Sequence, residues 1–179
     1  MQDQTLTEST IERLHEIYTQ VKDKNSGTRI LFTDPSGTGT TLAAFWLSAQ
    51  LEIPLYRVKV ASVLSKYISE TEQNLDDVFR KAAQSESILF IDEADALFGK
   101  RIKPPDENYR YAKIENHFLL QRLDEYPGLV ILTSNKKENI DERFIRAMDY
   151  VEEIETEVQP EINPWKIIID RLRKRLRKS

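Results

Sequence analysis

Two short runs of the sequence are apolar at every position, and they constrain the fold more than any other feature. Residues 88–91 are Ile-Leu-Phe-Ile, and residues 129–132 are Leu-Val-Ile-Leu. A strand with one face in water alternates apolar and polar residues, whereas a strand of a parallel sheet covered on both faces is apolar throughout. Both runs therefore predict central strands of a buried parallel sheet.

Strand-like and helix-like segments alternate along the rest of the chain. The apolar periodicity predicts helices over about 10–23, 41–50, 72–84 and 110–125, and strands over 29–33, 55–60, 88–91 and 129–132, with a half-charged edge strand at 151–155. Ser9 and Glu12 have the spacing of a capping box at the start of the first helix. This alternation predicts an α/β fold, a parallel sheet with helices on both faces. Ligands of such sheets bind at the carboxyl ends of the strands, here residues 34–41, 92–93 and 133–135.

Composition excludes several classes of function. A chain of 179 residues has the length of one globular domain with at most a small appendage. It contains no cysteine, which excludes disulfides, thiolate metal sites and cysteine nucleophiles, and with two histidines a multi-histidine metal site is not expected. No run approaches the ~18 apolar residues of a membrane span and the start lacks a signal-peptide pattern, so we expect a cytoplasmic protein without a membrane span.

The loop after the first predicted strand partly matches a phosphate-binding loop. Such a P-loop has the pattern Gly-x-x-x-x-Gly-Lys-Ser/Thr, in which backbone N–H groups hold phosphates, the lysine meets the outer phosphates and the hydroxyl holds Mg²⁺. This chain keeps Gly39 and Thr41 but has Asp34 at the first glycine and Thr40 at the lysine. Taken alone, the loop fits an ordinary strand-to-helix turn equally well. As a nucleotide site it would use Ser36, Gly37, Thr38, Gly39, Thr40 and Thr41, with Thr41 also on the metal.

Two adjacent carboxylates, Asp92 and Glu93, directly follow the buried run 88–91. This is the Walker B arrangement, in which the aspartate orders Mg²⁺ and the glutamate polarises the attacking water. Together with the loop about 50 residues upstream, the pair favours a nucleotide site over a chance juxtaposition.

With these motifs the sequence resembles the AAA+ ATPases over about residues 28–150. It is most similar to bacterial AAA-type ATPases that accompany contractile injection systems, with which it shares the segments 65–68, 70–72, 92–101, 110–112 and 119–123. The resemblance implies a P-loop NTPase core, ATP or ADP and Mg²⁺ as cofactors, assembly into a homo- or hetero-oligomeric ring or partial ring, and a protein partner or substrate.

The same resemblance implies roles for further residues. Asn135 matches the sensor-1 position that helps to place the lytic water, and Arg146 matches the arginine finger given to a neighbouring subunit. Tyr67 and Ile68 match the pore loop that grips extended polypeptide. Simpler alternatives are an Asn135 that caps a turn and a Tyr67 that packs at a helix start.

Two departures from the family pattern put the activity in question. Replacing the P-loop lysine by Thr40 removes a charge-assisted contact worth ~1.5–3 kcal/mol, and Asp34 adds a negative charge beside the polyphosphate. The chain is therefore expected to be an ATPase of weak Mg²⁺-dependent hydrolysis that remodels or helps to assemble a protein partner, or alternatively a pseudo-ATPase that acts as a non-hydrolysing structural subunit. Only 33 residues follow Arg146, room for about one helix, so the helical lid is expected to be largely absent, either from the protein or through truncation of the sequence.

We expect three parts: an N-terminal helix and linker (1–27), the core (28–158) and a basic amphipathic C-terminal helix (159–179) with Ile168, Leu172 and Leu176 on one face. The last nine residues carry six of the 26 basic residues, so the remainder has 20 basic against 30 acidic side chains. The core is thus not expected to bind nucleic acid. For the tail, three interpretations remain open: a solvated helix face, a segment that docks on an acidic protein surface, or a contact with nucleic acid or an anionic membrane.

Overall fold

The computed structural model describes residues 4–23, 27–98, 117–135, 138 and 140–158. The elements, in order, are β1 (Gln4–Leu6), α1 (Glu8–Val21), β2 (Thr28–Thr33), α2 (Gly39–Leu51), β3 (Leu55–Lys59), the 3₁₀ turn η1 (Val60–Ser62), α3 (Ile68–Gln84), β4 (Ile88–Asp92), α4 (Asp95–Phe98), a helical segment at 117–125, β5 (Leu129–Ser134), α6 (Glu142–Ala147), β6 (Tyr150–Glu153) and β7 (Thr156–Val158). Residues 110–116 of one predicted helix and the whole predicted C-terminal helix lie outside the described residues.

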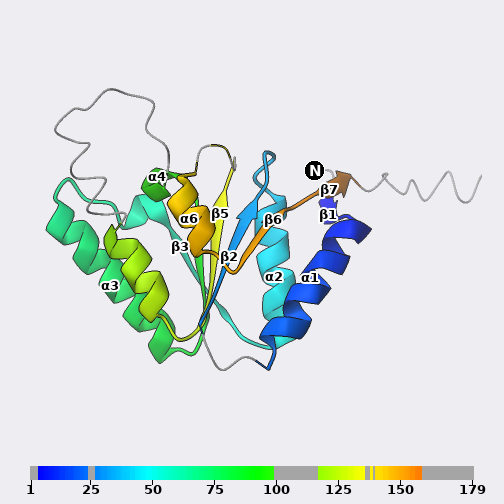
Figure 1. Cartoon of the computed structure of the whole chain (residues 1–179), viewed down its shortest axis with the longest axis horizontal. Coiled ribbons are helices and arrows are strands. Elements are labelled where there is room, and N and C mark those ends of the chain that lie inside the picture. The colour runs from blue at the N-terminus through cyan, green and yellow to red at the C-terminus, as the bar shows by residue number, and fades with distance from the viewer. Residues whose placement is uncertain (1–3, 24–26, 99–116, 136–137, 139, 159–179) are drawn as a thin grey trace, which may run out of the picture.

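The central sheet has five parallel strands in the order β3-β4-β5-β2-β6. Helices α1 and α2 cover one face, and α3 with segment 117–125 covers the other (Figure 1). The predicted α/β class, the parallel sheet and the helices on both faces are therefore confirmed. The half-charged run near residue 151 is also an edge strand, since β6 pairs only with β2 within the described sheet.

Alternate residues of β4 belong to two separate hydrophobic cores, which explains why this strand is apolar at every position. Ile88 and Phe90 pack with the core under α1 and α2, whereas Leu89 and Ile91 pack with the core under α3. All four side chains are at most 1% exposed. Successive side chains of a strand point to opposite faces of the sheet. A strand that is covered on both faces therefore needs apolar residues at every position.

The N-terminal segment is attached to the end of the described chain. Strand β1 pairs antiparallel with β7 over Gln4↔Val158 to Leu6↔Thr156, a pairing that the sequence pattern did not predict. Helix α1 begins at Glu8, two residues before the predicted start, because Thr7 and not Ser9 is the N-cap and accepts the backbone N–H of Thr10 at 3.3 Å.

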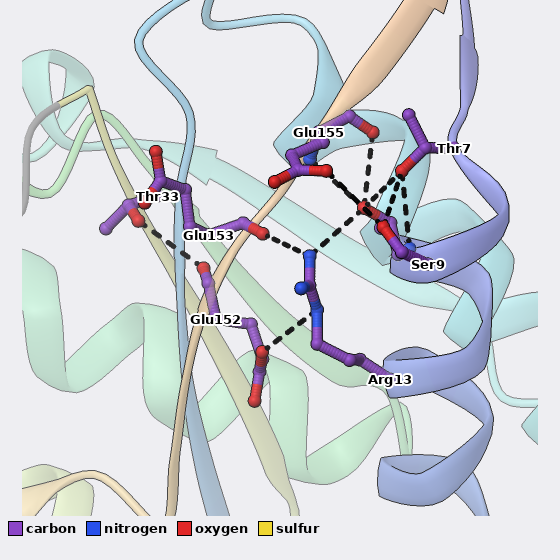
Figure 2. Close-up of polar contacts among 8 residues, drawn as sticks. Thr7, Ser9, Arg13, Thr33, Glu152, Glu153 and Glu155 are labelled. Atoms are coloured by element: carbon purple, nitrogen blue, oxygen red, sulfur yellow. Dashed lines mark hydrogen bonds and ion pairs between the residues drawn. The ribbon is translucent and has the colours of Figure 1, made fainter.

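Polar contacts hold the start of α1 against the segment that joins β6 and β7 (Figure 2). The fully buried Thr10 hydroxyl accepts the N–H of Glu155 at 3.1 Å and donates to its carbonyl at 3.3 Å. Arg13 donates to the carbonyl of Glu153 at 3.0 Å and pairs with the Glu152 carboxylate at 3.4 Å. These contacts fix α1 beside the edge of the central sheet.

Helix α3 begins at Ile68, four residues before the predicted start. Thr71 is fully buried, and its hydroxyl oxygen accepts the N–H of Ser65 at 2.9 Å, so the chain before the helix is folded back onto its first turn. Among the described residues, no helix is long and apolar enough to span a membrane.

Candidate functional site

The polar loops predicted to meet at one edge of the sheet do meet there. Strands β2 and β5 end in register at Thr33 and Ser134, and the Asp34 N–H continues the pairing by donating to the Ser134 carbonyl at 3.1 Å. The Ala94 N–H, just after β4, donates to the Thr133 carbonyl at 2.8 Å. The loops after β2, β4 and β5 are thus joined to one another by backbone hydrogen bonds.

Inside the loop after β2, the Asp34 carboxylate occupies the centre of the backbone turn. It is 3% exposed and accepts the N–H groups of Ser36 and Gly39, both at 2.6 Å, as well as the Ser36 hydroxyl at 2.7 Å. In a phosphate-binding loop, N–H groups at these positions point at the ligand. Here they are already bonded to an anion that belongs to the chain itself.

The two glycines of the loop are required by its geometry. Gly37 has φ +77°, a left-handed conformation that residues with a Cβ rarely adopt. At Gly39 a Cβ would lie 2.8 Å from side-chain carbons of Ile154 and Thr156 and 2.9 Å from the Asp34 carboxylate. Because Gly39 has no Cβ, the Asp34 carboxylate can come close enough to accept its N–H in the first turn of α2.

Both carboxylates of the Walker B pair are bonded to basic side chains of β3. Asp92 accepts Arg57 at 2.6 Å and the Thr133 hydroxyl at 2.9 Å, while Glu93 pairs with Lys59 at 3.4 Å. The Thr133 oxygen also accepts the Glu93 N–H at 3.1 Å, and Glu93 has a left-handed φ of 60°. The Lys59–Glu93 pair is more than half exposed and contributes little stability, but the Asp92 side chain is only 12% exposed.

Burial by itself raises the pKa of Asp92, but the hydrogen bonds from Arg57 and Thr133, with the charges of Arg57 and Lys59, outweigh it and hold the pKa below the ordinary carboxyl value of 3.8. A lowered pKa in the folded state stabilises the protein above the unfolded-state pKa, and this stabilisation is lost as the pH falls through the folded-state pKa.

We expect Arg57→Gln to lower the free energy of unfolding at pH 7 by about 1 kcal/mol, a modest value because solvent screens the partly exposed Arg57.

Urea unfolding at pH 7 and at stepwise lower pH checks this expectation. The difference between the natural chain and Arg57→Gln should shrink as the pH is lowered below 3.8. Arg80→Gln is the matched control, since it removes an exposed arginine paired with Asp77 and should change little at any pH. A loss that is the same at every pH would contradict the assignment to Asp92.

Asn135 lies at the same edge of the sheet, close to the loop after β2. Its side-chain amide oxygen is 3.5 Å from the position that a Cβ on Gly37 would take, and its backbone N–H donates to the Asp95 carboxylate at 3.0 Å. Asp95 also accepts the hydroxyl of Ser134. The structure therefore brings Asn135, the loop, Asp92 and Glu93 to one place.

The remaining predicted site residues lie elsewhere. Arg146 is on α6, its side chain is 80% exposed, and its ion pair is with Glu142 of the same helix at 3.3 Å. Tyr67 is the N-cap residue of α3 and is 60% exposed, with Ile68 as the first residue of that helix. Tyr67 is thus not packed at the helix start, and its role in gripping a polypeptide stays a prediction, as does the role of Arg146.

The arrangement in this structure does not fit a nucleotide with Mg²⁺. The N–H groups of Ser36 and Gly39 are bonded to Asp34, Asp92 is bonded to Arg57, and Thr40, predicted to replace the P-loop lysine, is buried. For ATP to bind, its phosphates would have to displace the Asp34 carboxylate from the loop.

Three residues of this site were not predicted: Arg57, Lys59 and Asp95. Thr133 was predicted only as part of the ligand-binding edge, without its contacts to Asp92 and Glu93. The alternation Arg57-Val58-Lys59 on a strand places two cations on one face, which was an available signal. Arg57 and Lys59 reach Asp92 and Glu93 because β3 and β4 are neighbours in the sheet. The sequence pattern does not give the order of the strands.

A parallel sheet of this order, with a glycine-containing loop after β2 and an acidic pair at the end of β4, is the fold of the P-loop NTPases. The profile of the family described as "ATPase family associated with various cellular activities (AAA)" matches residues 30–157, and the chain belongs to this family.

Several curated relatives are similar to this chain over most of its length. The chain is 34% identical over 124 residues to an uncharacterized AAA family ATPase, y4kL, of Sinorhizobium fredii, covering 69% of this chain and 37% of the relative. It is 30% identical over 146 residues to Fidgetin-like protein 1 of Drosophila melanogaster, covering 76% of this chain and 27% of the relative. It is 31% identical over 140 residues to the peroxisomal ATPase PEX6 of Saccharomyces cerevisiae, covering 73% of this chain and 13% of the relative. The alignments thus span well under half of each of these relatives.

Proposed function

We propose that this chain is a non-hydrolysing AAA subunit, which assembles with its own copies or with an active relative, rather than an ATP-driven motor. One observation carries the proposal: the Asp34 carboxylate already accepts the N–H groups of Ser36 and Gly39, two of those that would hold a phosphate. A bound phosphate would have to expel a carboxylate of the same charge sign from a buried position. The loop lacks the lysine that would compensate for this cost.

The acidic pair supports the same proposal. Mg²⁺ at Asp92 would compete with Arg57, and activation of water by Glu93 would require that its carboxylate leave Lys59. The Arg57–Asp92 pair opposes Mg²⁺ binding and the Lys59–Glu93 pair opposes activation of water, so together with Asp34 they oppose both nucleotide binding and hydrolysis. The five-stranded sheet and the helices on both of its faces, by contrast, are formed, and an assembly role requires such a folded core.

Assembly is supported by the family and by the surface. AAA proteins typically form oligomers, and this chain exposes Arg146 on α6, the residue that matches a finger directed to a neighbouring subunit. The motif resemblance to ATPases that accompany contractile injection systems supports a protein complex as the partner.

A weak Mg²⁺-dependent ATPase is the second candidate. It is favoured by the convergence of Asp92, Glu93 and Asn135 beside the loop, with the Asn135 amide oxygen next to Gly37. In that case Thr41 and Asp92 would hold the metal and residues 36–41 the phosphates, and the bound Mg²⁺ would supply charge stabilisation.

Phosphate release by the purified chain, measured beside its Glu93→Gln variant at millimolar Mg²⁺–ATP, separates the two candidates. We expect the two proteins to be indistinguishable, and we expect light scattering to show an oligomeric state that does not change with ATP or ADP. Turnover by the natural chain above that of Glu93→Gln would overturn the proposal in favour of the weak ATPase.

A further inference from the structure

A shallow depression of about 870 Å³ lies between the first turns of α1 and the two-stranded β1–β7 sheet, apart from the candidate nucleotide site. Leu6 and Ile11 contribute apolar surface to it, and the Ile11 side chain is 39% exposed. Strand β7, the last described element, lies beside β1 (Figure 1), where its residue Glu157 lines the depression and the next residue, Val158, pairs with Gln4. The chain therefore leaves the described structure at the border of this depression.

Four glutamates surround the apolar surface. Glu8, Glu12 and Glu16 repeat every four residues and so lie in one row along α1, and Glu157 comes from β7. Within the part of the chain that the structure describes, none of the four has an ion-pair partner, although the nearby Glu152 is paired with Arg13. Like charges at this spacing on a helix repel one another by a few tenths of a kcal/mol per pair.

The sequence that follows β7 has the complementary pattern. Ile168, Leu172 and Leu176 repeat every four residues, and residues 171–179 contain six basic side chains and no acidic one. Four residues separate Val158 from Asn163, enough to span about 13 Å in extended form. In the helical form that their spacing predicts, residues 163–179 are about 25 Å long, against about 21 Å for the 14 residues of α1.

We propose that this depression, defined by Leu6, Ile11 and the four glutamates, is the docking site for the basic C-terminal segment 163–179 of the same chain. The apolar row of the segment covers Leu6 and Ile11, and its cations pair with Glu8, Glu12, Glu16 and Glu157. A tether of four residues makes the contact intramolecular, which favours it over a second copy at low protein concentration. The inference does not depend on the proposed function, because none of these residues belongs to the nucleotide site.

Limited trypsin digestion of the full chain at low salt tests the proposal, with mass spectrometry to follow cleavage at the basic residues 171–178. The groove variant is Glu8→Gln, Glu12→Gln and Glu16→Gln combined. The matched control removes three exposed acids elsewhere by Asp77→Asn, Glu86→Gln and Glu138→Gln. Circular dichroism of each protein confirms that it is folded.

We expect the groove variant to be cleaved in its tail about tenfold faster than the natural chain, a change of about 1.4 kcal/mol, the scale of three exposed ion pairs. The control should be cleaved at the natural rate, and the difference should disappear at about 0.5 M salt, where the charges are screened. Equal cleavage of all three proteins, or equal acceleration of groove variant and control, would overturn the proposal. Protection that increases with protein concentration would also overturn it, since it would place the segment of a second copy in the groove.

Discussion

A variant that combines Asp34→Gly with Thr40→Lys is expected to bind Mg²⁺–ATP at least a hundredfold more tightly than the natural chain. The glycine releases the N–H groups of Ser36 and Gly39 from the internal carboxylate, and the lysine adds a charge-assisted contact to the phosphates. Hydrogen bonds to charged groups contribute about 1.5–3 kcal/mol each, so even two of these three contacts at the lower value give roughly 3 kcal/mol, and 1.4 kcal/mol corresponds to a factor of ten. Isothermal titration calorimetry with ATP, with and without Mg²⁺, measures the change.

Single variants separate the two contributions. Asp34→Asn is the matched control, because an asparagine keeps an acceptor oxygen and nearly the same volume but removes the charge. If the Asp34 carboxylate competes with phosphate for the loop, Thr40→Lys should increase ATP affinity less in the natural chain than in the Asp34→Gly variant. Residues that share a site are coupled in this way. Equal gains from Thr40→Lys in both backgrounds would show that Asp34 does not compete with phosphate.

Phe90→Ala is expected to lower the free energy of unfolding by about 3–5 kcal/mol. Phe90 is 0% exposed in a central strand and packs in the core under α1 and α2, with the Arg57 guanidinium 5.5 Å from its ring centroid. Truncation leaves a cavity that neighbouring strands cannot close, and a domain of this kind is stable by only about 5–15 kcal/mol. Urea unfolding followed by circular dichroism measures the loss.

The control for this substitution is Phe45→Ala on α2, where the same side chain is 55% exposed. We expect that change to stay within about 0.5 kcal/mol of the natural chain. A loss below about 1.5 kcal/mol for Phe90→Ala would contradict the placement of this residue in a tightly packed core.

The central sheet was predictable because its signal is local. Residues 88–91 and 129–132 are apolar without interruption, and a short run of this kind between helices is typical of a strand buried on both faces. Strands β1 and β7 were not predictable, because each has three residues, too few to show a period, and they pair across about 150 residues of sequence. The start of α1 differs from the prediction for another reason: two hydroxyl residues, Thr7 and Ser9, could each cap the helix, and the structure uses Thr7.

The candidate site was predictable in its residue types and less so in its bonding. The identity of Asp34 indicated a conflict with phosphate, but the return of its carboxylate to the Gly39 N–H depends on the conformation of residues 34–39. The pairing of Arg57 with Asp92 depends on which strand adjoins β4. Both contacts follow from tertiary geometry, which periodicity and spacing do not determine.

The order of strands also has a consequence for how the chain folds as it is synthesised. Strand β2 lies between β5 and β6, and β1 pairs with β7, so the earliest strands receive their neighbours only after residues 129–158 have emerged. At ribosomal rates of about 5–20 residues per second, β2 waits at least several seconds for β5. During this interval the apolar side chains of Ile30, Leu31 and Phe32 have no sheet partners, and unpaired apolar strands are the segments of a nascent chain that are prone to aggregate.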